Sequence, residues 1–140
     1  TAYKGDHVMA SGGYIVAGTA SGATNVGVFN GCFYIDPTSK KPTWSNYYNQ
    51  TNVTATGSIS GSTNIDAYIY DDPYYLFEIQ TDGTVAKTAI GDNADTTAGL
   101  QIKIIGITKD PENDDASSAN SNWYVMFNEH LKLGTGITGA

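Results

Sequence analysis

Residues that could carry nucleophilic or metal chemistry are few in this chain and lie far apart in sequence. The single cysteine, Cys32, lies in a strand-like run without a histidine or a local positive charge, so we expect a buried hydrophobic side chain rather than a nucleophile. His7 and His130 fit no zinc-binding spacing such as HExxH, and we expect surface or hydrogen-bonded core groups. The sequence therefore predicts no catalytic residues and no enzyme.

Three acidic clusters, at residues 71–72, 92–95 and 110–115, offer the oxygen ligands that Ca²⁺ prefers. None has the alternating acids, central glycine and terminal glutamate of an EF-hand loop. Asp and Asn also close turns, because their side chains bond to nearby backbone amides. We expect turns at these clusters, including an Asx turn before Pro73, and predict neither a metal site nor a cofactor.

Composition narrows the class of partner. The chain has 140 residues, a mass of 14.8 kDa and a net charge of -7, with 14 acidic residues against 7 lysines and no arginine. A nucleic-acid binder needs a basic face to neutralise phosphates, so we expect no nucleic-acid partner. No apolar run approaches the roughly 18 residues of a membrane span, so we expect no membrane partner either.

Short runs rich in β-branched and aromatic residues, bounded by Gly, Asn, Asp or Pro, recur along the chain and predict strands. The expected strands are residues 6–10, 13–18, 25–29, 31–35, 44–48, 67–70, 76–81, 84–88, 100–108, 123–128 and 130–133. Long polar loops are expected at 51–64 and 110–122, and one helical turn near 91–99. The fold prediction is all-β: a single domain over residues 1–140, an antiparallel barrel or sandwich of about eight to ten short strands.

Turn residues and alternation give local detail. Glycine pairs with Ser, Asn or Asp predict hairpins at 11–13, 30–31 and 82–83, and prolines predict a loop at 36–42. Alternation places Phe77 and Ile79 on one face of their strand. In residues 101–107, it places Ile102, Ile104 and Gly106 on one face, and Lys103, Ile105 and Ile107 on the other.

Aromatic side chains are unusually many for so few charges: ten Tyr, four Phe and two Trp. Neighbouring aromatics on one strand point to opposite faces, so they cannot all be core. Tyrosine suits an interface, where its ring is buried and its hydroxyl is wet. An interface and a tyrosine-filled core are both consistent with this composition. We nominate Trp44, Tyr47 and Tyr48 as interface residues, because they follow a loop and cluster together.

Several motifs in order resemble one known family. Residues 27–37 read GVFNGCFYIDP, residues 40–48 read KKPTWSNYY, and residues 71–80 read DDPYYLFEIQ. Residues 92–95, 104–107 and 134–136, with Asn128 and His130, continue the pattern. The chain resembles the head decoration, or capsid cement, proteins of tailed bacteriophages over about residues 5–137. The family pattern often has an arginine near the Pro-x-Trp motif, where this chain has Lys41.

The resemblance implies a non-enzymatic structural protein of a virion. Its partner would be the major capsid protein, whose subunits it would bridge on the outer face of the capsid, after assembly in the bacterial host cytoplasm. A homo-oligomer, trimer or dimer, is expected, because several weak contacts per assembly raise the effective concentration.

Both ends of the chain are candidates for arms that add a strand to a neighbour. Residues 134–139 have the glycine spacing of a dinucleotide fingerprint, but no helical pattern follows, so an arm is the better interpretation. Arms are expected at residues 1–4 and 134–140, adjoining Leu133. The proposed contact residues there are Thr1, Ala2, Tyr3, Lys4, Leu133 and Ile137.

The alternative hypothesis is a β-sandwich carbohydrate-binding module. Exposed Tyr and Trp rings would stack on sugar rings, and Ca²⁺ bound at the acidic clusters would assist sugar binding.

Overall fold

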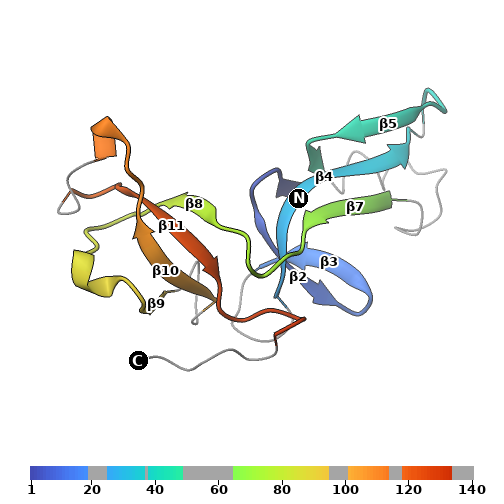
Figure 1. The fold of residues 1–140 in the computed structure, drawn as a ribbon. Coiled ribbons are helices and arrows are strands. Elements are labelled where there is room, and N and C mark those ends of the chain that lie inside the picture. Colours follow the sequence, from blue (N-terminus) through green and yellow to red (C-terminus); the bar gives the residue numbers. More distant parts are fainter. Residues whose placement is uncertain (19–24, 37, 49–64, 95–100, 114–117, 134–140) are drawn as a thin grey trace. The chain divides into compact units, whose positions relative to one another are not determined.

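The computed structural model describes residues 1–18, 25–36, 38–48, 65–94, 101–113 and 118–133. These residues form strands in several antiparallel sheets, joined by short 3₁₀ turns (Figure 1). The all-β prediction is therefore confirmed, although the described sheets are open and close no barrel. No helix within the described ranges has the length and hydropathy of a membrane span. The expected loop at 51–64 and the arm at 134–140 lie outside the described residues.

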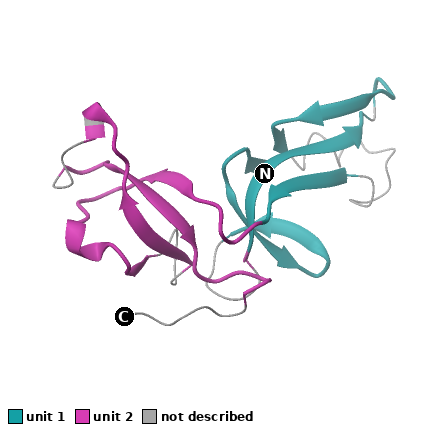
Figure 2. Ribbon diagram, in the orientation of Figure 1, with its two compact units in different colours: residues 1–18, 26–71 teal, residues 19–25, 72–140 magenta. Residues whose placement is uncertain are grey.

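The chain folds into two compact units, each described here by itself (Figure 2). Unit 1 comprises residues 1–18 and 26–71, and unit 2 comprises residues 19–25 and 72–140. That the two form a single domain stays a prediction.

Unit 1 contains a five-stranded sheet and a two-stranded sheet. The larger has the order β3-β2-β4-β5, with β7 paired to the other edge of β4, and the smaller pairs β1 with β6. The strands are β1 (Ala2–Tyr3), β2 (His7–Ser11), β3 (Tyr14–Ala17), β4 (Asn25–Ile35), β5 (Pro42–Ser45), β6 (Tyr47–Tyr48) and β7 (Ile65–Tyr70). The predicted hairpin at 11–13 is confirmed: Gly12 and Gly13 have positive φ and join β2 to β3.

The predicted hairpin at Asn30–Gly31 is wrong. β4 runs unbroken through both residues, and its register with β7 shifts between Phe29 and Gly31, which marks a β-bulge. Gly31 has a φ of 151°, a conformation that suits glycine in a bulge as well as in a turn. The sequence signal was correct about the backbone conformation and incorrect about the chain reversal.

The core of unit 1 is small. Val8, Phe29 and Cys32 are fully buried, and partly buried side chains from β1, β3, β4, β6 and β7 pack around them: Ala2, Ile15, Tyr34, Tyr48, Ile65 and Ile69. The bulge keeps Phe29 and Cys32 on this same face, although they are three residues apart. The expectation that Cys32 is a buried hydrophobic residue is confirmed.

Unit 2 is built on a four-stranded sheet in the order β8-β11-β10-β9. Its elements are β8 (Phe77–Gln80), η2 (Lys87–Ala89), β9 (Asn93–Ala94), β10 (Ile102–Ile107), η3 (Pro111–Asn113) and β11 (Asn122–Phe127). Trp123 and Ile104 lie at the centre of its core, and Val85, Ala89, Ala94 and Ile107 pack against them. The predicted shared face of Phe77 and Ile79 is confirmed, since both alternate with exposed neighbours.

The alternation predicted for residues 101–107 fails at its second half. The register of β10 with β11 shifts between Ile104 and Gly106, so Ile105 is an extra residue. Ile107 consequently returns to the core face beside Ile104 and Trp123, instead of facing outward with Lys103.

Four other local predictions for unit 2 are wrong. Asp82–Gly83 forms no hairpin, because β8 pairs with β11. Residues 84–88 form no strand, because the segment turns into η2 over the core. Residues 130–133 form a turn, closed by the Leu133 amide donating to the carbonyl of His130 at 2.9 Å. β9 occupies part of the expected helical turn at 91–99, and residues 95–100 lie outside the described ranges.

A buried asparagine joins the ends of β10 and β11. The Asn113 Nδ2 donates to the carbonyls of Thr108 and Asn122, at 2.9 and 2.7 Å, and its Oδ1 accepts the Asn122 amide at 2.6 Å. These bonds satisfy the Thr108 carbonyl and the Asn122 amide, and they add a second donor to the Asn122 carbonyl, which also accepts the Thr108 amide at 3.1 Å.

Replacing Asn113 with alanine should lower the free energy of unfolding by about 2–3 kcal/mol, because three bonds are lost and buried backbone groups stay unsatisfied. Urea denaturation measures this change. Ser118→Ala, at an exposed position in the same connection, should leave the midpoint unchanged. Equal stability of both variants would contradict the structural role of Asn113.

Candidate functional site

The outer face of the β5-β4-β7 sheet carries a row of apolar and aromatic side chains. Register places Phe33 opposite Trp44, and Gly31 opposite Tyr68. Because paired residues share a face and Cys32 points into the core, these side chains point away from it. We call Phe33, Ile35, Trp44, Tyr68 and Tyr70 the aromatic face. Phe33 is half-buried, whereas the other four are exposed, with Trp44 at 47% and Tyr68 at 49%.

A glycine in the central strand makes this face continuous. Trp44 on β5 and Tyr68 on β7 meet edge to face, with ring centroids 5.0 Å apart, although β4 lies between their strands. A Cβ atom at Gly31 would lie 2.6 Å from Trp44 Cζ2 and 2.8 Å from the Ser45 carbonyl oxygen. Only a residue without a side chain therefore lets the two rings meet over the middle of the sheet.

The indole of Trp44 is held in place by its polar end. Its Nε1 donates to Asn46 Oδ1 at 3.1 Å. With that donor satisfied within the chain, the exposed part of the ring presents mainly carbon to solvent. This arrangement favours contact with an apolar or flat partner surface over hydrogen bonding by the indole.

The aromatic residues nominated from the sequence differ in their exposure to solvent. Trp44 and Tyr47 are exposed, but Tyr48 is half-buried and packs against the core cluster of Val8, Phe29 and Cys32. Tyr48 therefore contributes to stability, and its replacement would be a poor probe of an interface.

The N-terminal residues lie beside this cluster. Ala2 pairs with Tyr48 and Tyr3 with Tyr47, so β1 is a strand of its own unit and not a free arm. Ala2 packs against the core, Tyr3 stacks on Tyr47, and Thr1 and Lys4 are exposed. Donation of this strand to a neighbouring copy stays a prediction.

Sequence reasoning found only Trp44 of the five residues of the aromatic face. Phe33, Ile35, Tyr68 and Tyr70 were not among the nominated residues. The signal was present in residues 66–70, Asp-Ala-Tyr-Ile-Tyr, because Tyr68 and Tyr70 alternate with the more buried Ile69. The meeting of β5 with β7 across β4 depends on long-range pairing, and no local motif reveals it.

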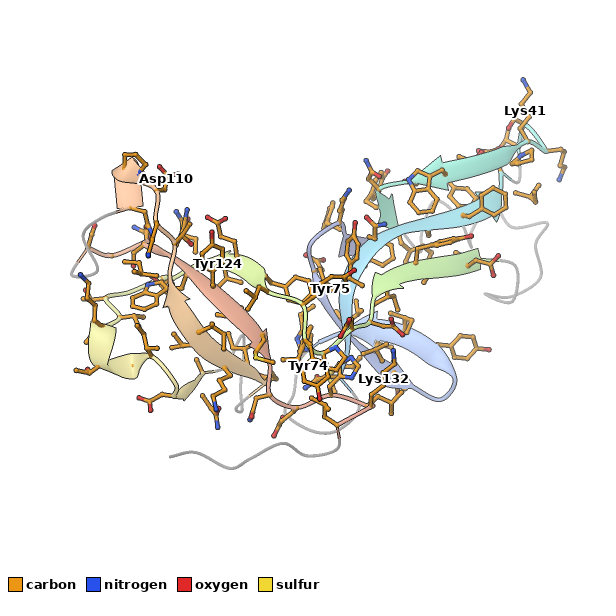
Figure 3. All side chains as sticks on the ribbon, in the orientation of Figure 1. Lys41, Tyr74, Tyr75, Asp110, Tyr124 and Lys132 are labelled. Carbon is orange, nitrogen blue, oxygen red and sulfur yellow. The ribbon has the colours of Figure 1, made fainter. Side chains whose placement is uncertain are left out.

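One end of the aromatic face is marked by charge. Lys40 and Lys41 lie at the tip joining β4 to β5, where Lys41 projects outward (Figure 3). The loop predicted at 36–42 does begin after Ile35, but Pro42 already belongs to β5 and pairs with Ile35. The amides of Ser39 and Thr38 donate to Asp36 Oδ1, at 2.7 and 2.8 Å, and lower the pKa of this carboxyl group.

The side chains that could act as a nucleophile or a base, Cys32 and His130, have structural roles. Burial raises the pKa of the Cys32 thiol, which disfavours the reactive thiolate, and its Sγ lies 3.7 Å from the Tyr47 carbonyl oxygen. His130 is buried in unit 2, where its Nδ1 accepts the Lys132 amide at 3.1 Å. The expectation of a hydrogen-bonded core histidine is thus confirmed for His130.

The turn expected at residues 92–95 is wrong, because Asn93 and Ala94 form β9, whereas the cluster at 71–72 does form a turn. Asp72 Oδ1 accepts the amide of Tyr74 at 2.9 Å, which confirms the predicted Asx turn. Within the described ranges, no three His, Cys, Asp or Glu side chains gather as a metal site would require. Residues 95, 114 and 115 of these clusters lie outside those ranges.

Unit 2 has exposed apolar side chains of its own. Tyr74, Tyr75 and Leu76 follow the Asx turn, and Tyr124 lies on the outer side of β11 (Figure 3). Leu133, nominated from the sequence, is exposed in the turn after His130. Ile137 lies outside the described residues.

Comparison with known proteins finds no matching family model, no similar curated protein and no similar solved structure.

Replacing Gly31 with alanine should displace Trp44 and lower the free energy of unfolding by about 1–3 kcal/mol, through steric conflict and backbone strain at positive φ. Two-dimensional NMR of the indole N–H, together with urea denaturation, measures both effects. Gly83→Ala is the matched control, because a Cβ there meets nothing within 4 Å. An unmoved Trp44 signal in the Gly31 variant would disprove the packing described above.

The Cys32 thiol should resist modification in the native state, because it is buried and its pKa is raised. Ellman's reagent at neutral pH should react slowly with the folded protein and fast after denaturation in urea. A native rate equal to that of the unfolded chain would contradict the burial of Cys32.

Proposed function

We propose that this chain is a non-enzymatic structural protein that decorates the outer face of a tailed-phage capsid and bridges subunits of the major capsid protein. The sequence resemblance to head decoration proteins over about residues 5–137 suggests the partner and the location. The structural observation that carries the proposal is the aromatic face. It supplies a docking surface of the composition expected for the centre of a protein interface.

The residue types on this face fit a protein partner. Trp, Tyr and Phe are enriched at interface centres, while Lys and Glu are depleted there and stay at the rim. Trp44, Tyr68 and Tyr70 follow this pattern, with Lys40 and Lys41 beyond the end of the row. Apolar side chains that are exposed on a sheet face lower the solubility of a protein. Burying them against a partner contributes about 25 cal/mol of favourable free energy per Å² of apolar surface.

The charge balance fits the outside of a shell better than its interior. With a net charge of -7 and no arginine, the chain gains nothing from packaged DNA. Single copies with one modest aromatic face would bind weakly. Self-association into a trimer or dimer, which belongs to the proposal, would raise retention on a repeating lattice because linked copies rebind before they diffuse away.

A carbohydrate-binding module is the second candidate, and Trp44 favours it. Its indole N–H is already bonded to Asn46, which leaves exposed ring carbon for stacking on a sugar, and Asp66 lies in the same cross-strand row. A glycan array with the wild-type protein and Trp44→Ser separates the two candidates. Specific glycan binding without capsid binding would favour the second.

The double variant Trp44→Ser, Tyr68→Ser should bind undecorated capsids at least about tenfold more weakly, because buried aromatic anchors typically carry 2 kcal/mol or more each. Co-sedimentation with undecorated tailed-phage capsids measures the affinity. Tyr74→Ser, which removes a still more exposed tyrosine from unit 2, is the control. Unchanged binding by a folded double variant would reject the aromatic face as the docking surface.

A further inference from the structure

Two tyrosine rings from distant parts of the sequence are stacked at the surface of unit 1. Tyr3 on β1 and Tyr47 on β6 are direct cross-strand partners. Their ring centroids lie 5.8 Å apart, and their planes differ by 17°. Both rings are open to solvent, with exposures of 58% and 44%. Two phenol rings are thus held side by side where a soluble oxidant can reach them.

The backbone around the pair keeps the rings in register. The Lys4 amide donates to the Asn46 carbonyl at 2.9 Å, next to the β1–β6 ladder. The Tyr3 amide donates to Asp6 Oδ2 at 2.8 Å, which fixes the turn that leads into β2. The inward-facing partners, Ala2 and Tyr48, pack against the core. The two phenols therefore lie close before any reaction, which removes most of the entropic cost of bringing them together.

We propose that the Tyr3–Tyr47 pair is a site of oxidative cross-linking, at which a peroxidase-type oxidant joins the two rings as an intrachain dityrosine. Each phenol loses one electron and one proton to give a tyrosyl radical. The two radicals couple through their ortho carbons and, after tautomerisation, both hydroxyl groups are retained. One hydrogen peroxide accepts the two electrons and two protons and becomes two waters, so the reaction is balanced.

Two other exposed tyrosines lack this arrangement. Tyr14 and Tyr74 have exposures of 53% and 69%, but within the described ranges neither has another ring stacked on it. Radicals formed at such positions must meet a tyrosine of another molecule, so their products depend on protein concentration. Coupling at Tyr3–Tyr47 is intramolecular, so it dominates in dilute solution.

The bond would anchor the first strand of unit 1. β1 has two residues, and its ladder with β6 is correspondingly short. A covalent link from Tyr3 to Tyr47 closes a long loop and restricts the unfolded chain, which stabilises the folded state. It also holds β1 on its own β6, so that the strand can no longer pair with a neighbouring copy. This inference is independent of the proposed capsid role.

The test treats dilute purified protein with a haem peroxidase and hydrogen peroxide, followed by peptide mass spectrometry. We expect dityrosine fluorescence, a monomer lighter by two hydrogen atoms, one cross-linked peptide pair containing Tyr3 and Tyr47, and a raised melting temperature. Tyr3→Phe should lose the monomeric product, whereas Tyr14→Phe should retain it. Phenylalanine keeps the ring, so both variants should fold.

Three results would overturn the proposal. One is cross-linking spread evenly over the exposed tyrosines. Another is a Tyr3–Tyr47 link that occurs only in covalent dimers, which would assign β1 to a neighbouring copy. The third is an absence of dityrosine under conditions that couple free tyrosine.

Discussion

The structure of unit 1 depends on one constraint: β4 must pair with three other strands as a single unbroken strand. This strand of eleven residues has β2 and β5 along one edge and β7 along the other, so it cannot turn or end midway. Strict alternation along it would put Phe29 and Cys32 on opposite faces. The bulge at Asn30 removes that conflict by adding one residue, and both side chains reach the same core. The other strands of the unit take their positions from this register.

The same register determines which side chains are left outside. Once Phe29 and Cys32 are inward, Gly31 and Phe33 must be outward, and the pairing brings Trp44 and Tyr68 to either side of the glycine. A core of three fully buried residues is small for a sheet of this size. Much aromatic carbon therefore stays at the surface, where it is available to a partner.

The sequence revealed the all-β class, the 11–13 hairpin, the Asx turn at Asp72 and the burial of Cys32, because each follows from local residue chemistry. It did not reveal the bulges at Asn30 and Ile105. At Asn30–Gly31 the bulge uses the same permissive residues as a turn, and only the pairing partner distinguishes the two, whereas Ile105 carries no local turn signal at all. Only Trp44 of the aromatic face was found from the sequence, because it stands out locally, whereas its contact with Tyr68 exists only after two non-adjacent strands meet across β4.

The two tryptophans of the chain are divided between the units and lie in opposite environments. Trp44 belongs to unit 1 and is 47% exposed, whereas Trp123 belongs to unit 2, is 1% exposed and donates its Nε1 to Ser121 Oγ at 2.8 Å. Their intrinsic fluorescence should accordingly have separate emission maxima. Each unit thus carries its own optical reporter, and a single melting curve recorded at two wavelengths would reveal whether the halves of this chain lose their structure together or in turn.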